Sequence, residues 1–181
     1  YLDIRRYIMA NPLYGQNKSD NAIDFALNAS SGQLFSTVIV AGDNAQYGTA
    51  AAPMGKSHMN RTIVQGHTNG LDLWLPSIDA TDAGLWLQII SGVTNGGAST
   101  VVTAASGDLL VGNTIATKAT DAVANSVYFA ADGSDDLIFT WNGTTMGGLI
   151  GSEVFFQANK DGYWYVKSVA HGSGSLATPF T

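Results

Sequence analysis

Short runs of β-branched and aromatic residues, separated by turn-forming pairs, fill this chain from residue 33 to residue 169. Asn-Gly and Asp-Gly pairs favour tight reversals of the backbone. No stretch after residue 30 has the 3.6-residue apolar period of a helix, and the pattern therefore predicts an all-β fold. The clearest turn pairs are Asn69-Gly70, Asp132-Gly133, Asn142-Gly143 and Asp161-Gly162.

Strands at this spacing, joined by tight turns, are typical of an antiparallel β-sandwich or barrel, with a jelly-roll-like arrangement. The clearest hairpin turns at Asp161-Gly162, where aromatic residues on both sides can pair across strands. Residues 43–60, which are small and include Pro53, are expected to form a loop. The expected strands cover residues 33–40, 61–65, 71–75, 85–91, 100–105, 108–111, 125–130, 137–141, 153–157 and 163–169.

The first 31 residues differ from the rest, because they are turn-rich and polar with a few apolar groups. A segment this short does not hold one shape alone. We therefore expect residues 1–31 to form an extended N-terminal arm that packs on another subunit, ahead of a β-domain over residues 32–181 that ends in a flexible tail, 171–181. Met9 opens a plausible start, so residues 1–8 are a candidate upstream extension. The expected partner-binding anchors of the arm are Asn11, Pro12, Leu13, Tyr14, Ile23, Phe25 and Leu27.

The charge balance limits which partners suit the chain. Charged residues make up 12% of the sequence, against about 25% in ordinary globular domains. The formal net charge is −6, and residues 62–181 hold three basic residues against ten acidic ones. Because phosphate contacts need Lys and Arg, we expect no nucleic-acid partner. No apolar run approaches the roughly 18 residues of a membrane helix, so we expect no membrane partner either.

The residues offer little for catalysis or cofactor binding. The chain has no cysteine, which excludes disulfides, thiolate catalysis and iron–sulfur clusters. Gly55-Lys56-Ser57 resembles the end of a phosphate-binding loop, but Ala50 stands where that motif needs glycine, so a surface loop is the favoured interpretation. No histidine has the spacing of a metal site, and we expect neither metal nor cofactor. The three histidines are His58, His67 and His171.

Two acidic features have more than one interpretation. Asp132-Gly133-Ser134-Asp135-Asp136 carries carboxylates that suit calcium, but Gly143 occupies the twelfth position, where an EF-hand loop has an acid. An acidic turn is the alternative that we favour. Glu153 is the only glutamate, and at the start of an aromatic strand it indicates a solvated strand end rather than a general acid.

Neither of the remaining motifs predicts an enzyme. The segment Gly172-Ser173-Gly174-Ser175-Leu176 comes near a nucleophile-elbow motif but lies in the expected tail. The tryptophans could form a sugar-stacking surface, but their spread over separate strands favours a sandwich core. They are Trp74, Trp86, Trp141 and Trp164.

Several segments resemble recurrent segments of small virion proteins of tailed bacteriophages, in particular head decoration, or cement, proteins common in marine phages. TVVTAASGDLLVG at residues 100–112 and FAADGSDDLIFTWNGT at residues 129–144 carry most of this resemblance. Further similar segments are residues 9–17, 71–76, 148–154 and 162–166.

The resemblance implies a structural role without turnover. It implies that the major capsid protein is the partner, that the protein lies on the outer surface of the capsid of a virion assembled in the host cytoplasm, and that it stabilises the shell. Decoration proteins of this kind often occupy threefold positions, which implies a homotrimer. The alternative is a tail, fibre or adhesin module that binds carbohydrate on the host surface.

Overall fold

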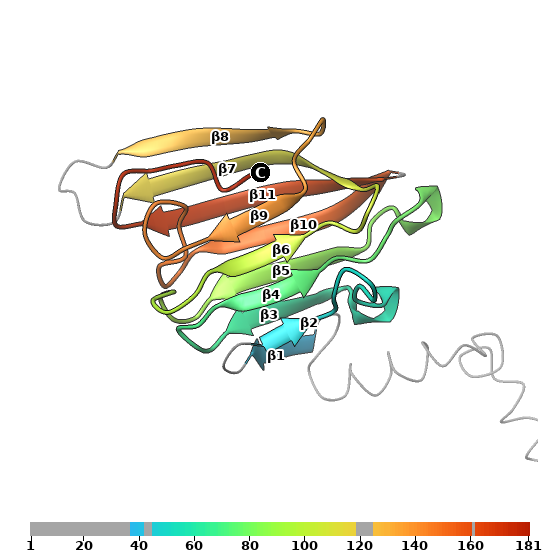
Figure 1. Ribbon diagram of the computed structural model, residues 1–181, viewed down its shortest axis with the longest axis horizontal. Helices are drawn as coiled ribbons and strands as arrows, with labels where there is room; N and C mark the ends of the chain where they lie inside the picture. Colours follow the sequence, from blue (N-terminus) through green and yellow to red (C-terminus); the bar gives the residue numbers. More distant parts are fainter. Residues whose placement is uncertain (1–36, 42–44, 119–124, 161) are drawn as a thin grey trace, which may run out of the picture. The chain divides into compact units, whose positions relative to one another are not determined.

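The computed structural model describes residues 37–41, 45–118, 125–160 and 162–181 (Figure 1). Residues Val38–Thr181 form a compact unit. The arm expected over residues 1–31, with all of its anchors, lies outside the described residues, so that prediction stays a prediction.

The regular secondary structure of the described chain is almost entirely β, which confirms the expected all-β class. Its two helical segments are single 3₁₀ turns, η1 (Lys56–His58) and η2 (Ala80–Asp82). The strands are β1 (Thr37–Ala41), β2 (Ala45–Tyr47), β3 (Arg61–Gln65), β4 (Leu71–Trp74), β5 (Trp86–Ser91), β6 (Thr100–Thr103), β7 (Leu109–Lys118), β8 (Ser126–Asp132), β9 (Ile138–Trp141), β10 (Glu153–Lys160) and β11 (Tyr163–Gly172).

Two sheets face each other across the core. The larger sheet has the order β1-β3-β5-β10-β11-β7-β8, and the smaller has the order β2-β4-β6-β9. Both sheets are mixed, because parallel pairing joins β3 to β5, β7 to β11, β2 to β4 and β4 to β6. The expectation of an antiparallel fold is therefore wrong, and the sheets do not close into a barrel.

The parallel pairs arise because successive strands alternate between the two sheets. The chain passes from β3 in the larger sheet to β4 in the smaller and back to β5, so β3 and β5 run in the same direction. Parallel neighbours need such a crossover, which a helix usually supplies and a strand supplies here. Asn69-Gly70 and Asp132-Gly133 accordingly turn the chain from one sheet to the other. Of the clearest turn pairs, only the pair that precedes β11 in the sequence lies between two strands that are hydrogen-bonded to each other, β10 and β11.

Aromatic rings fill the space between the sheets. Trp141 and Trp164 are fully buried, which confirms the core interpretation for these two tryptophans. The ring of Phe139 is the centre of a cluster, with centroid distances of 5.4 Å to Trp141, 5.7 Å to Phe156 and 5.6 Å to Phe180. Tilted and edge-on pairs at these distances stabilise a core beyond the area they bury.

The C-terminal residues differ from the expected flexible tail. His171 belongs to β11, and Phe180 is buried against Phe139, with which it forms a β-bridge. The carbonyl of Thr181 accepts hydrogen bonds from the amides of Leu137 and Ile138 at 2.9 and 2.7 Å. Glycine and serine at residues 172–175 suggested flexibility, but the apolar group that follows them anchors the segment in the core.

A closed network of buried polar side chains ties the two sheets together at one end. The amide of Gln65 on β3 donates to the side-chain oxygen of Asn95, which follows β5. Asn95 Nδ2 donates to Trp141 O on β9 at 2.9 Å and to Thr100 Oγ1 on β6 at 3.2 Å. Thr100 Oγ1 donates to Gln65 Oε1 at 2.6 Å, which completes a ring of satisfied groups.

Replacing Asn95 by alanine should lower the free energy of unfolding by about 2–3 kcal/mol, because the carbonyl of Trp141 and the hydroxyl of Thr100 would lose a buried partner. Urea titration followed by tryptophan fluorescence measures the change. Asn113→Ala is the matched control, because this half-buried asparagine lies on β7 outside the network and its loss should change the free energy by less than about 0.5 kcal/mol. Equal effects from both variants would contradict a structural role for the network.

Candidate functional site: the outer face of the larger sheet

The larger sheet has one surface turned away from the smaller sheet. Burial alternates along β5, β10 and β11, so every second side chain on these central strands points outward. We call this surface the outer face. Its members on β5, β7, β10 and β11 are Trp86, Gln88, Ile90, Val111, Asn113, Ile115, Glu153, Phe155, Gln157, Tyr165, Lys167 and Val169.

Cross-strand register arranges the outer face in rows of mixed character. Gln157 lies between Trp86 and Tyr165 in one row. In the next row Phe155 lies between Gln88 and Lys167. The rings of Trp86 and Phe155 stack diagonally between the rows, with centroids 5.8 Å apart and planes inclined by 25°. Aromatic rings therefore alternate with amide side chains across the middle of the sheet.

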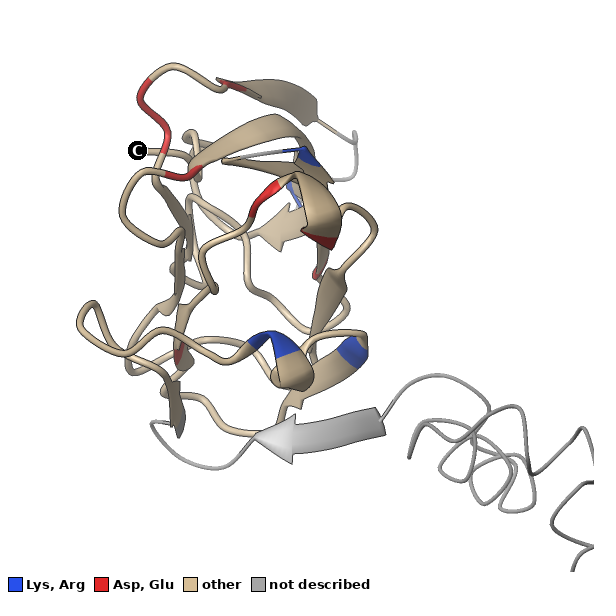
Figure 2. Cartoon of the chain, turned by 90° about the vertical axis from the view of Figure 1, so that its right-hand side faces the viewer, with Lys and Arg blue, Asp and Glu red and all other residues tan. Residues whose placement is uncertain are grey.

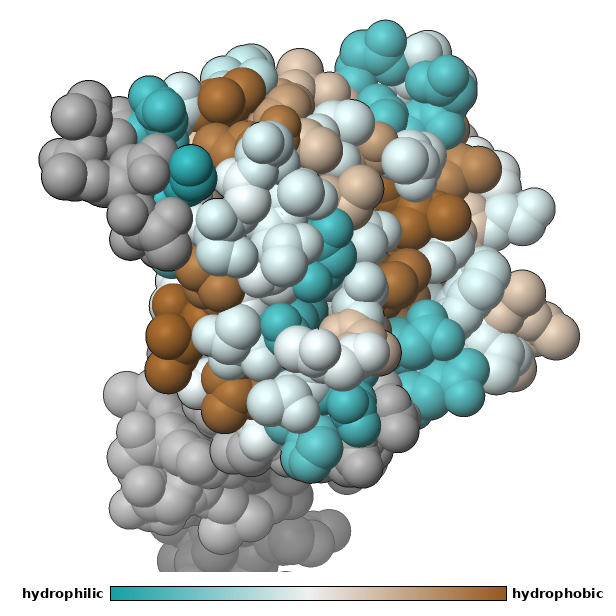
Figure 3. Space-filling view, turned by 60° about the vertical axis from the view of Figure 1, so that its left-hand side comes forward, coloured by the Kyte–Doolittle hydropathy of each residue, from teal (hydrophilic) through white to brown (hydrophobic). Residues whose placement is uncertain are grey.

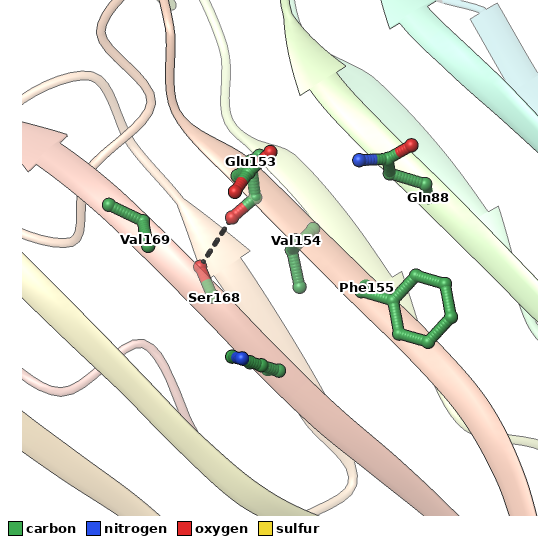
Figure 4. Close-up of a pocket in the computed structure, with 7 residues that line it drawn as sticks. Gln88, Glu153, Val154, Phe155, Ser168 and Val169 are labelled. Atoms are coloured by element: carbon green, nitrogen blue, oxygen red, sulfur yellow. Dashed lines mark hydrogen bonds between the residues drawn. The ribbon is translucent and has the colours of Figure 1, made fainter.

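A shallow depression of about 220 Å³ opens in the middle of the outer face (Figure 4). Gln88, Glu153, Phe155 and Val169 are among its lining residues. The hydroxyl of Ser168 at its base donates to the backbone carbonyl of Glu153 at 2.9 Å. This serine is therefore committed to a structural bond, and the depression is smaller than the pockets of about 300–1,000 Å³ that enclose small ligands.

Few charges lie on the outer face: Glu153 and Lys167 are its charged members on β5, β7, β10 and β11, and Asp132 of β8 lies on the same surface opposite Val111. Figure 2 shows that charged residues are sparse along the described chain as a whole. Glu153 is exposed at the start of β10, as its interpretation as a solvated strand end predicts. Figure 3 shows another side of the molecule, where hydrophobic residues lie in separate patches among polar ones.

This arrangement suits contact with a large, flat partner. A sheet face with half-buried aromatic rings supplies apolar area, and the neighbouring amides supply hydrogen bonds without the cost of removing charges from water. The alternation of inward and outward residues along each strand is the signal for this face in the sequence. The sequence does not show which outward-facing surfaces of the strands remain uncovered, and the outer face could not be predicted for that reason.

The lysine of the phosphate-loop candidate Gly55-Lys56-Ser57 takes part in a surface ion pair. Lys56 lies in η1, and its ammonium group is 2.5 Å from the carboxylate of Asp82 and 3.6 Å from that of Asp79. The hydrogen bond that Lys56 donates to the Asp82 carboxylate raises the pKa of Lys56, while hydrogen bonds that Thr81 donates to Asp79 lower the pKa of Asp79. Asp79 also caps η2, so these charges hold two short turns together at the surface.

The histidines lie in different parts of the described chain. His58 ends η1, and His67 follows β3. On β11, His171 forms a hydrogen bond of 2.6 Å between its Nδ1 and the hydroxyl of Thr117 on β7. Among the described residues, the cluster with metal-ligand spacing is the acidic turn, and it contains none of the histidines.

The acidic turn after β8 brings the carboxylate oxygens of Asp132, Asp135 and Asp136 within 4.8 Å of one another. Ser134 donates to Asp132 from its amide at 2.8 Å and its hydroxyl at 2.6 Å, which lowers the pKa of Asp132. Partial burial and the two neighbouring carboxylates raise the pKa of Asp136. The hydrogen bonds define a turn that leads from β8 to β9, and the choice between a plain acidic turn and a calcium site stays a prediction.

Comparisons with family models, curated proteins and solved structures found no match to this chain. In the part of the chain that the structure describes, no helix has the length and apolar character to cross a membrane. The arm anchors lie outside that part, and the prediction that they bind a partner stays a prediction. They are Asn11, Pro12, Leu13, Tyr14, Ile23, Phe25 and Leu27.

Proposed function

We propose that this chain is a structural virion protein, a decoration or cement subunit that binds the major capsid protein on the outside of a tailed-phage head. It stabilises the shell through many repeated contacts and performs no turnover. In this proposal it acts as a homotrimer and joins the capsid during assembly in the host cytoplasm. The resemblance of residues 100–112 and 129–144 to small virion proteins supports this role.

The outer face is the observation that carries the proposal. A lattice repeats one contact many times, so a single copy needs only modest affinity. Neutral, wet interfaces built from amides, hydroxyls and scattered rings supply contacts of that strength. Trp86, Phe155 and Gln157 provide such groups on a rigid sheet. The arm adds a second contact in the proposal, with Pro12, Leu13 and Tyr14 inserted into the capsid surface.

Rebinding to stripped heads tests the proposal. Deleting residues 1–31, or replacing exposed Tyr165 on the outer face by alanine, should each weaken binding at least about tenfold, since each removes a contact worth more than about 1.4 kcal/mol. Ile150→Ala is the control, because this side chain is exposed in the loop before β10, outside the outer face. Bound copies per head are counted by quantitative mass spectrometry, and circular dichroism verifies that each variant is folded.

Shell rupture on heating provides the functional measurement. Heads without the protein should rupture at lower temperature, and the added full chain should restore resistance at both low and moderate salt, because few ion pairs are available to be screened. Unchanged rupture after stripping would contradict the cement role. Binding that collapses at moderate salt would show that charge, rather than the outer face, holds the protein in place.

A carbohydrate-binding module of a tail or fibre is the second candidate. The stacked Trp86–Phe155 pair and exposed Tyr165 favour it, because sugar rings pack on exposed aromatic faces. The copy number separates the two candidates. Hundreds of copies over the head support decoration, whereas a few copies at one vertex, together with binding to host glycans, support the adhesin.

A further inference from the structure

Strand β8 forms one edge of the larger sheet. It pairs with β7 on one side, and no strand of the described chain pairs with it on the other (Figure 1). Side chains near this edge are unusually exposed for their type: Tyr128 is 63% exposed, Ile115 on β7 is 45% exposed and Val127 is 40% exposed. Natural sheets usually protect an edge with lysine, proline or a bulge. The charged residue in β8 is Asp132, at the end of the strand, and β8 contains no proline.

The register shows which backbone groups of β8 face the open side. The amide of Lys118 donates to the carbonyl of Asn125, so this pair is a hydrogen-bonded one. Hydrogen-bonded and non-hydrogen-bonded pairs alternate along an antiparallel ladder. The N–H and C=O groups of Ser126, Tyr128 and Ala130 therefore point away from β7. The next such amide, that of Asp132, is already bound by the Asp136 carboxylate at 3.0 Å, which ends the open edge.

We propose that β8 pairs antiparallel with β8 of a second copy of this chain, about a twofold axis at Tyr128. In this register Tyr128 lies opposite Tyr128 of the partner subunit, and Ser126 lies opposite Ala130 of the partner subunit. Every open backbone group of the edge then finds a partner. On the other surface of the sheet, Val127 lies opposite Phe129 of the partner subunit, which buries apolar area that is exposed in one copy.

Charge favours the antiparallel orientation. A parallel pair would bring together the acidic turns that follow β8, with Asp132, Asp135 and Asp136 in each copy. The twofold pair places these turns at opposite ends of the ribbon. Each turn then lies at the end where β7 of the other copy carries Lys118. Such a contact is isologous and closes after two copies, so it is separate from the proposed trimer and does not depend on the proposed function.

Single-cysteine crosslinking of the full chain tests the register. The chain has no cysteine, so Tyr128→Cys introduces one thiol per copy. Directly opposed residues of a hydrogen-bonded pair have Cα atoms about 5.5 Å apart, within the range of a disulfide. Mild oxidation should convert most of Tyr128→Cys into a disulfide-linked dimer. Ile150→Cys, an equally exposed position away from the edge, should remain mostly monomeric in the same gel.

Analytical ultracentrifugation of the unlinked full chain tests the contact itself. The dissociation constant of the dimer should rise at least tenfold in Tyr128→Lys and in Ala130→Pro, while Ile150→Lys leaves it unchanged. Proline at Ala130 removes an amide that faces the open edge, so the pairing with β7 is retained and circular dichroism should be unaltered. A monomer at all concentrations, an assembly insensitive to both β8 variants, or equal crosslinking at Tyr128 and Ile150 would each overturn the proposal.

Discussion

Replacing Gly112 by alanine should lower the free energy of unfolding by about 3–5 kcal/mol, within the range of the most damaging single substitutions. Gly112 lies inside β7 with φ +144°, and a Cβ there would lie 2.0 Å from the carbonyl oxygen of Val166 and 2.8 Å from its amide nitrogen. Val166 is the register partner of Gly112 on β11. The added methyl group would therefore force apart the two strands of the longest parallel pairing in the described structure.

Gly96→Ala is the matched control for this prediction. Gly96 is exposed in the loop between β5 and β6, and a Cβ added there meets no atom within 4 Å. Urea titration of both variants should show a large shift in midpoint for Gly112→Ala and a change within about 0.5 kcal/mol for Gly96→Ala. A small effect at Gly112 would mean that the close approach of β7 and β11 does not exist.

Replacing Phe180 by alanine should cost about 3–5 kcal/mol, the usual cost of removing a fully packed phenylalanine from a core. Phe180 is 3% exposed, and its ring lies 5.6 Å from that of Phe139. The substitution leaves a cavity beneath β9 and weakens the β-bridge and the backbone hydrogen bonds that hold the last residues against this strand.

Leu137→Ala provides the comparison. The backbone amide of Leu137 donates a hydrogen bond to the carbonyl of Thr181 in the C-terminal segment, but the Leu137 side chain is 42% exposed. We expect this variant to lose less than about 1 kcal/mol in a thermal or urea melt. If Phe180→Ala is no more damaging than Leu137→Ala, the C-terminal segment is the flexible tail that the sequence predicts.

The positions of most strands could be predicted from the sequence, because branched and aromatic runs bounded by turn residues are local signals. The expected strand over residues 61–65 coincides with β3, and the hairpin at Asp161-Gly162 is confirmed. β2 was missed, because Ala45–Tyr47 is short and lies among small residues. The second half of β7 was also missed, because Gly112 and Asn113 look like the end of a strand.

Strand partners could not be predicted, because they depend on contacts between distant residues. A turn at Asn69-Gly70 reverses the chain equally well within one sheet or between two sheets. Whether the chain stays in one sheet or crosses to the other depends on how the apolar sides of β3 and β4 are buried in the core. The candidate outer face is hidden from sequence for the same reason, since Phe155 and Tyr165 look like core residues until the order of the strands is known.

The alternation of strands between the two sheets also determines how the chain can fold in time. From β3 to β6, each strand finds its partner after one intervening strand, so this part can form as the chain collapses locally. The pairing of β7 with β11 joins residues as distant as Thr117 and His171, 54 positions apart. Non-local parallel pairing slows folding, because a long loop must close before any contact is gained. We therefore expect β11 to enter last, between β10 and β7, so that a nascent chain exposes the edges of both strands until β11 has been synthesised.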